Sequence, residues 1–171
     1  MHKFVADLCI QVNEPAKAER SLKEAQQLLT NEEERGEVEE FMIHPGLACI
    51  HTQLCMVAYA QKRSMEALEE LKTAMQHWES VPEKILKEYE LTCRLRCMLH
   101  LLFGEKDAAG KAAGDFLLFM EQSEEYVKRK SEKPFLHTKL YFMNIVCSCE
   151  DNKDLYLSVV PDGLENIGFL N

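Results

Sequence analysis

The chain of 171 residues is long enough to bury a hydrophobic core, and its composition, 46% hydrophobic and 29% charged residues, is typical of a globular protein rather than a disordered one. Its net charge of −9 argues against a generic nucleic-acid binder, because phosphate contacts require clustered lysine and arginine. No apolar run reaches the roughly 18 residues of a membrane span, and the first residues lack the apolar core of a signal peptide.

Helical periodicity runs through nearly the whole chain, whereas strand-like alternation is hard to find before its C-terminal end. Apolar stripes such as Ala18, Leu22, Ala25 and Leu29 place their members on one helix face. We expect helices near residues 2–12, 15–29, 31–42, 46–62, 64–79, 82–103, 106–122, 124–130 and 134–148, and a shorter element near 153–160. The fold class is therefore expected to be all-α.

Helix starts are predicted from capping patterns. Thr30 with Glu33, and Ser80 with Glu83, match a capping box, in which the hydroxyl and the carboxylate satisfy amides at a helix start. The segment Glu132 to Pro134 places a proline where an early helical turn tolerates it.

Helix ends are predicted from proline and glycine. The segment His44 to Gly46 is expected to break the chain before the next helix, and Gly104 is expected to end the long helix that precedes it. The connections are short, which favours antiparallel neighbours. No linker divides the chain, so residues 1–171 are expected to form a single helical domain.

Pairs of small residues twelve positions apart occur three times, as Ala6 with Ala18, Cys55 with Ala67, and Cys97 with Ala109. In each pair the first residue falls on one predicted helix and the second falls just inside the next. Two antiparallel helices joined by a tight turn approach closely only where side chains are small. Such a pair cannot bury its own apolar face, so pairs are expected to stack.

This pattern resembles the tetratricopeptide repeat, a helix-turn-helix unit of about 34 residues. The second small residues are separated by 49 positions (18 to 67) and by 42 (67 to 109), and the family's closing proline is absent, so the resemblance is to a divergent form. It implies stacked antiparallel helical hairpins in a segment of right-handed superhelical solenoid. Another α-helical bundle is the structural alternative.

The resemblance also implies a protein-binding function, because the first helix of each pair usually lines a concave groove in this family. By position, that groove would include Thr52, Met56, Tyr59, Arg63, Arg94, Met98 and Leu101. A mixture of apolar and cationic side chains suits a partner peptide or helix that binds through apolar anchors. The alternative is that Met98 and Leu101 belong to the core.

The sequence contains few residues in patterns typical of catalytic or metal-binding sites. Cys93, Cys97 and His100 share a helix face, and Cys147 lies near Cys149, but neither spacing is that of a structural zinc site. No nucleophile elbow, phosphate-binding glycine loop or HExxH motif occurs. We therefore expect a noncatalytic protein without metal or cofactor.

The seven cysteines are odd in number and mostly fall in apolar helical runs, which favours buried thiols in a reducing compartment, the cytoplasm or the nucleus. The apolar ends suggest a fragment of a longer solenoid, or ends covered by a partner or a second copy. The expected function is a scaffold or adaptor within a multiprotein complex. The alternatives are a helical subunit of a proteasome-lid-like scaffold and a metal- or thiol-dependent enzyme.

Overall fold

A computed structural model of the chain describes residues 14–35 and 40–149, and all regular structure within these ranges is helical. The helices are α2 (Pro15–Arg35), α3 (Glu40–Ala60), α4 (Ser64–Glu79), α5 (Leu86–Leu102), α6 (Lys106–Gln122), α7 (Glu124–Arg129) and α8 (Lys133–Cys149). This confirms the all-α fold class. The elements expected near 2–12 and 153–160 lie outside the described residues.

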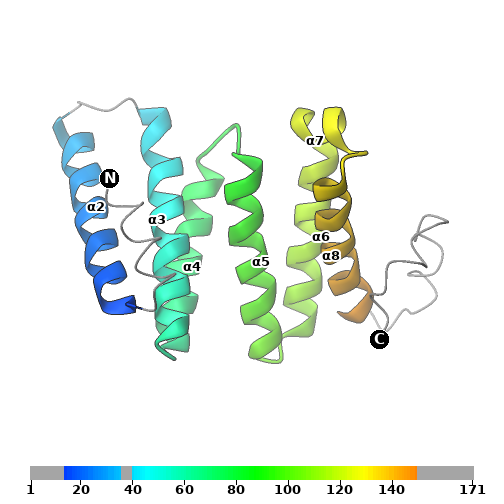
Figure 1. The fold of residues 1–171 in the computed structure, drawn as a ribbon, viewed down its shortest axis with the longest axis horizontal. Helices are drawn as coiled ribbons and strands as arrows, with labels where there is room; N and C mark the ends of the chain where they lie inside the picture. Colours follow the sequence, from blue (N-terminus) through cyan, green and yellow to red (C-terminus); the bar gives the residue numbers. More distant parts are fainter. Residues whose placement is uncertain (1–13, 36–39, 150–171) are drawn as a thin grey trace. The chain divides into compact units, whose positions relative to one another are not determined.

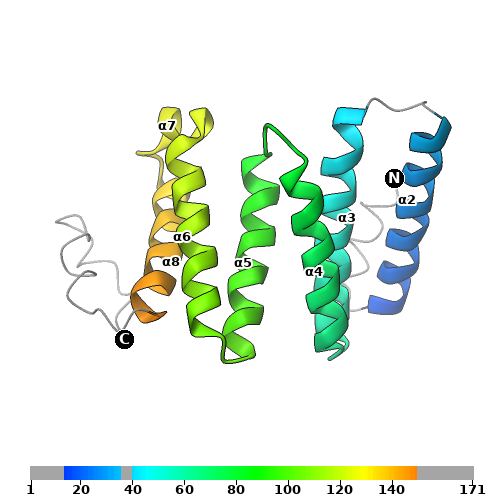
Figure 2. The same ribbon diagram turned by 180° about the vertical axis from the view of Figure 1, so that it is seen from behind.

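The chain divides into two compact units, Met1–Leu95 and Arg96–Asn171, and the boundary between them falls inside α5. In the first unit α2 packs on α3, and α3 lies antiparallel along α4, as Figure 1 and the reverse view in Figure 2 both show. In the second unit α6 lies beside α8. A single domain over residues 1–171 stays a prediction.

The core of the first unit contains the apolar stripes that the sequence predicted. Ala18 and Leu22 of α2 form a buried cluster with three residues of α3, namely Ile50, Leu54 and Val57. Ala25 and Leu29 continue the α2 stripe and pack against this cluster. Burial of this apolar surface is the main force that holds α2 on α3.

The core of the second unit is built on aromatic contacts between α6 and α8. The rings of Phe116 and Phe142, both fully buried, lie with their centroids 4.2 Å apart at a tilted angle of 37°. Ala109, Ala112 and Ala113 on α6 are also buried. Their small side chains permit close packing around the two rings.

Two hairpin turns in the chain have the same backbone structure. After α3, the amide of Lys62 donates to the carbonyl of Tyr59 at 2.9 Å and that of Arg63 donates to Ala58 at 2.9 Å. After α5, the amide of Gly104 donates to Leu101 at 3.1 Å and that of Glu105 donates to His100 at 2.8 Å. This pair of bonds, with a positive φ at Lys62 and Gly104, defines a Schellman motif at each turn.

The small residues beside these turns are buried as expected. Cys55 and Ala67 are both fully buried, and so are Cys97 and Ala109. The thiol of Cys97 lies 3.7 Å from the carbonyl oxygen of Ala109, which brings the second pair into direct contact. Ala6, the first member of the remaining pair, lies outside the described residues.

Two predicted helix boundaries before α4 are wrong. The helix α2 continues through Thr30 to Arg35, because the Thr30 hydroxyl donates to the Gln26 carbonyl inside the helix rather than capping a new one. The helix α3 begins at Glu40 and continues through Pro45. A proline there removes only one hydrogen bond near the helix start, and burial of the flanking Ile43 and Leu47 offsets that loss.

The predicted start of α5 near residue 82 is also wrong, because the helix begins at Leu86. Ser80 is the C-cap of α4, and its amide donates to the carbonyl of His77 at 3.1 Å. Ser80 therefore closes one helix instead of opening the next. Gly104 and the segment Glu132 to Pro134 were predicted correctly as a helix stop and a helix start.

Candidate partner-binding groove

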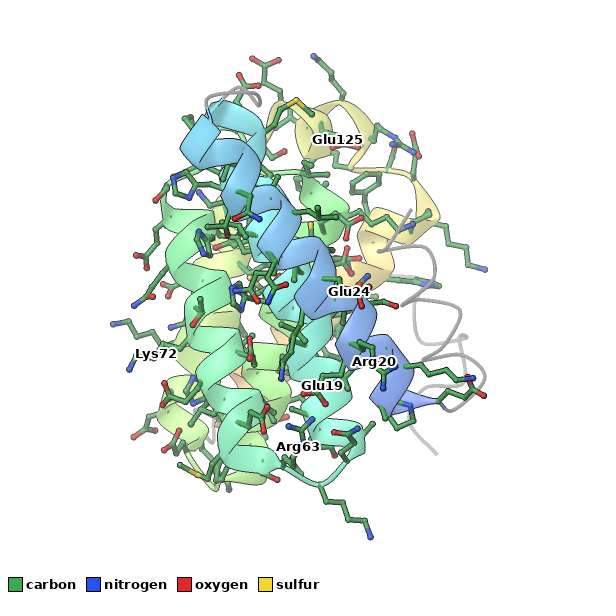
Figure 3. The ribbon with its side chains drawn as sticks, turned by 90° about the vertical axis from the view of Figure 1, so that its left-hand side faces the viewer. Glu19, Arg20, Glu24, Arg63, Lys72 and Glu125 are labelled. Atoms are coloured by element: carbon green, nitrogen blue, oxygen red, sulfur yellow. The ribbon has the colours of Figure 1, made fainter. Side chains whose placement is uncertain are left out.

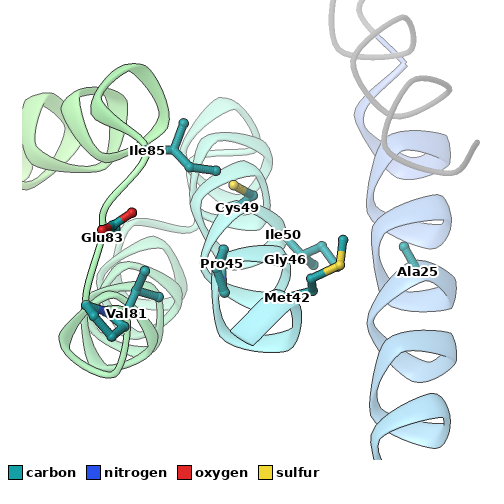
Figure 4. A pocket seen from close by; sticks show the side chains of 10 residues that line it. Ala25, Met42, Pro45, Gly46, Cys49, Ile50, Val81, Glu83 and Ile85 are labelled. Carbon is teal, nitrogen blue, oxygen red and sulfur yellow. The ribbon is translucent and has the colours of Figure 1, made fainter. Parts of the chain in front are cut away.

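An apolar groove of about 770 Å³ lies in the first unit, between α2, α3 and the connection from α4 to α5. Figure 4 shows α3 in the middle of the lining residues, with α2 on one side and the connecting segment on the other. The lining residues are Ala25, Met42, Pro45, Gly46, Cys49, Ile50, Val81, Pro82, Glu83 and Ile85.

Two local features shape the walls of the groove, a glycine on α3 and the anchored segment that follows α4. Gly46 allows close approach of α2, because a Cβ at this position would lie 2.7 Å from a terminal methyl carbon of Leu29. The segment after α4 is anchored by the buried Val81, whose amide donates to the Trp78 carbonyl at 3.2 Å. The α4–α5 connection is thereby held across from α3 as an irregular wall.

The rim of the groove exposes large apolar side chains to solvent. Met42 is 58% exposed and Ile85 is 53% exposed, although each has apolar neighbours in the groove. Glu83 is the one charged residue among the ten that line it. The groove therefore offers an apolar surface with a carboxylate at its edge, which would attract a cationic group.

The Thr52 side chain, predicted to line a groove, is instead 97% buried in a polar chain of the core. The indole N–H of Trp78 donates to the Thr92 hydroxyl at 2.9 Å, and the hydroxyls of Thr92 and Thr52 lie 2.8 Å apart. The Thr52 hydroxyl in turn donates to the Ala48 carbonyl at 2.7 Å. This chain satisfies the buried indole and links α4, α5 and α3.

The two arginines of the predicted groove are engaged in ion pairs. Arg63 contacts Glu66 and also Glu19, whose carboxylate lies 2.6 Å from the guanidinium and ties α2 to the α3–α4 turn. Figure 3 labels both residues and shows Glu19 on α2 and Arg63 next to the α3–α4 turn. Arg94 pairs with Glu90 one turn earlier on α5 at 2.6 Å.

The other residues of that prediction are more accessible. Tyr59 is 39% exposed and Leu101 is 42% exposed, whereas Met56 and Met98 are half-buried. None of the seven lines the apolar groove described above, so the sequence prediction missed this groove. The six residues other than Thr52 stay a prediction for a different surface.

The sequence contained signals for the observed groove that helical periodicity did not capture. The dipeptide Val81–Pro82 directly follows a helix end, and the segment His44 to Gly46 was interpreted as a break rather than as a helix face. Val81 and Pro82 line one wall of the groove, and Pro45 and Gly46 on α3 line another. Their proximity depends on how α3 packs, which local sequence does not determine.

Cys93, Cys97 and His100, which share a helix face, are packed or hydrogen-bonded within the fold. The Nδ1–H of His100 donates to the Glu105 carboxylate at 2.7 Å across the α5–α6 turn, while Cys93 and Cys97 are buried. Burial, with a smaller contribution from the charge of Glu70, raises the pKa of the Cys55 thiol to about 12. Across residues 14–35 and 40–149, no cluster of three ligand side chains is arranged to hold a metal ion.

Comparison with protein-family models, with curated proteins and with solved structures gave no match. Within the part of the chain that the structure describes, no helix combines the length and the apolar character needed to cross a membrane. The fold and the groove are therefore the observations on which a function can be proposed.

Proposed function

We propose that the protein is a noncatalytic scaffold or adaptor of an intracellular complex, and that its apolar groove binds a helix of a protein partner. The single observation that supports this proposal most strongly is the groove of about 770 Å³ between α2, α3 and the α4–α5 connection. An apolar channel with exposed rim residues suits the helix-in-groove mode of recognition.

The groove also indicates the chemistry of its partner. Met42 and Ile85 at the rim would contact apolar anchors, which an amphipathic helix presents at positions i, i+3 or i+4, and i+7. Glu83 would pair with a lysine or arginine that flanks those anchors. The acidic balance of the whole chain, −9, favours the same kind of basic partner.

We further propose that the chain is a divergent tetratricopeptide-like array. The Schellman turns at Lys62 and Gly104 lie 42 residues apart (62 to 104), and the buried small pairs recur at the same interval (55 to 97 and 67 to 109). A recurrent turn with a recurrent small contact supports a repeated hairpin unit.

Two alternatives make different predictions. A helical subunit of a proteasome-lid-like scaffold would also bind partners through helices, but it would require a further domain. A thiol-dependent enzyme would require a reactive thiolate, and Cys55, with its pKa raised to about 12, does not supply one. Metal analysis with thiol labelling of the folded protein would identify such an enzyme.

The proposal is tested with a phage-displayed peptide library selected against the full-length protein. We expect selected peptides to share apolar residues at helical spacing and to carry lysine or arginine beside them. The variants Met42→Asp and Ile85→Asp place a carboxylate in the groove and should abolish binding, because a buried charge without a partner is strongly disfavoured.

The matched control is Met65→Asp on α4, because Met65 is 65% exposed and does not line the groove. This variant should bind the selected peptides as the unmodified protein does. Circular dichroism of all three variants establishes that each retains its helices. Peptides that bind equally well to Met42→Asp, or a library without any binder, would overturn the assignment of the groove.

A further inference from the structure

Three histidines meet at the interface between α3 and α4. The Nδ1 atoms of His44 on α3 and His77 on α4 lie 3.1 Å apart. The ring of His51, two turns further along α3, stacks on His77 with centroids 5.6 Å apart and an interplanar angle of 17°. His77 thus lies against both other imidazoles, and its ring centroid is 5.4 Å from that of His44.

The contact between His44 and His77 requires at least one unprotonated ring. A hydrogen bond between two Nδ1 atoms has one N–H donor and one lone-pair acceptor, so one imidazole must be neutral at that nitrogen. If both rings were protonated, two N–H groups and two positive charges would face each other at 3.1 Å. The contact is therefore compatible with no proton or one extra proton on the pair, but not with two.

His51 is fully satisfied in its neutral form. Its Nδ1 lies 2.6 Å from the carboxylate of Glu70 on α4, so Nδ1–H donates to that oxygen. Its Nε2 lies 3.3 Å from the side-chain amide nitrogen of Gln26 on α2 and accepts a hydrogen bond from it. A second proton on His51 would remove this acceptor and break the bond to α2 unless the Gln26 amide turned over.

The charges around His77 favour its neutral form. Burial lowers the pKa of His77, and the neighbouring charges of His51 and His44 lower it further. Among the described residues, the groups that contact it are His44 and His51 from α3, while Glu70 on α4 pairs with His51 and Gln26 from α2 is uncharged. Full protonation would therefore place three positive charges around a single carboxylate.

We propose that His44, His51 and His77 form a pH-sensitive clamp, which holds α3 against α4 at neutral pH and weakens that contact in mildly acidic solution. The proposal is independent of the groove and of any partner. Histidine is the side chain whose charge ordinarily changes near neutral pH, and the lowered pKa of His77 places the response below about pH 6.5.

The direction of the effect follows from proton binding. A histidine whose pKa is lower in the folded protein than in the unfolded chain binds its proton preferentially in the unfolded chain. The stabilisation from His77 is therefore fully present above the ordinary histidine pKa of about 6.5, and it is lost as the pH falls through the lower pKa of the folded protein.

The test is urea unfolding of the full-length protein at a series of pH values between about 8 and 5. The variant His77→Asn keeps a side-chain amide near the Nδ1 position but does not titrate. We expect the urea midpoint of the unmodified protein to fall more steeply with acidification than that of His77→Asn. The matched control is His137→Asn, because His137 lies exposed on α8 in the second unit.

A second measurement keeps the test decisive if His77→Asn does not fold. Proton NMR of the imidazole Cε1–H groups follows each histidine directly, and His44→Asn removes the other member of the hydrogen-bonded pair. We expect the His77 signal to titrate below the range of an exposed histidine. Titration of His77 at or above that range, or equal pH slopes for the unmodified protein and His77→Asn, would overturn the clamp.

Discussion

Lys62 occupies the same position in the α3–α4 turn that Gly104 occupies in the α5–α6 turn. Both residues have a positive φ, 61° for Lys62 and 76° for Gly104, and both lie at the C′ position of a Schellman motif. Only glycine adopts this backbone conformation without a steric penalty between Cβ and the backbone. The α3–α4 turn therefore retains the geometry of its counterpart at an energetic cost.

The variant Lys62→Gly should stabilise the protein by about 1 kcal/mol, because it removes that penalty. Lys62 is exposed, so little side-chain packing is lost. Urea unfolding followed by circular dichroism measures the change.

The converse variant, Gly104→Ala, should destabilise the protein by a similar amount. A Cβ at residue 104 would meet nothing within 4 Å, so this cost is purely conformational. Destabilisation by Lys62→Gly would contradict the equivalence of the two turns.

The variant Thr92→Val should destabilise the protein by about 1–3 kcal/mol, because it leaves the buried indole N–H of Trp78 without its acceptor. Valine has nearly the same shape as threonine, so the loss reports the hydrogen bonds rather than a cavity. Trp78 is the only tryptophan in the chain, and its fluorescence follows this site directly during urea unfolding.

The control for this prediction is Thr30→Val on α2. Thr30 also donates to a backbone carbonyl, that of Gln26, but it is exposed and water can replace the bond. The expected change is therefore small. If Thr92→Val and Thr30→Val had equal effects, the polar chain from Trp78 to Thr52 would contribute nothing specific.

The sequence predicted the helices best where apolar spacing and turn chemistry agreed. The stripe from Ala18 to Leu29 and the stop at Gly104 depend on local rules, and the structure confirms both. The break predicted at Pro45 failed because burial of the flanking Ile43 and Leu47 outweighed a local signal for termination. The break predicted at Thr30 failed because its hydroxyl bonds to the Gln26 carbonyl inside α2 and does not cap a new helix. Local propensity is a weak predictor wherever tertiary packing contributes several kilocalories.

The site was harder to predict than the fold. Thr52 was assigned to a groove by its position in a resemblance, yet its hydroxyl completes a buried chain with Thr92. The observed groove joins Ala25 to Ile85, residues that are distant in the sequence and meet only through packing on α3. The histidine cluster likewise joins His44 to His77, a relationship that no periodicity encodes.

The buried thiol of Cys55 should be unreactive in the folded protein. Burial raises its pKa to about 12, whereas an ordinary cysteine thiol has a pKa of about 8.5, so the nucleophilic thiolate is scarce at neutral pH. We expect iodoacetamide, followed by peptide mass spectrometry, to label Cys55 only after denaturation. Rapid labelling in native buffer would contradict its burial.

The same thiol contributes a pH dependence in alkaline solution. Because its pKa is higher in the folded protein than in the unfolded chain, the folded protein holds the proton more tightly. The associated stabilisation is fully present below the ordinary thiol pKa and is lost as the pH rises toward about 12. The variant Cys55→Ala should therefore show a shallower loss of stability between about pH 8.5 and 10 than the unmodified protein does.

Alanine substitutions at the two glycines of α6, Gly110 and Gly114, should change the stability of the protein in opposite directions. A Cβ at Gly114 would meet nothing within 4 Å, so Gly114→Ala should stabilise the helix by about 1 kcal/mol through its higher helix propensity. A Cβ at Gly110 would lie 2.9 Å from the Cβ of Cys149 on α8. Gly110→Ala should therefore destabilise the contact between α6 and α8, because overpacking of this kind typically costs about 1–3 kcal/mol.

The double variant Gly110→Ala with Cys149→Gly distinguishes the steric contact from other effects of the substitution. Removal of the Cys149 side chain eliminates the opposing Cβ, so Gly110→Ala should be less destabilising in this background than in the unmodified protein. Urea midpoints of the single and double variants complete the cycle. Equal and favourable effects of alanine at residues 110 and 114 would mean that α8 does not approach α6 at Cys149, and the packing of the second unit would need a different account.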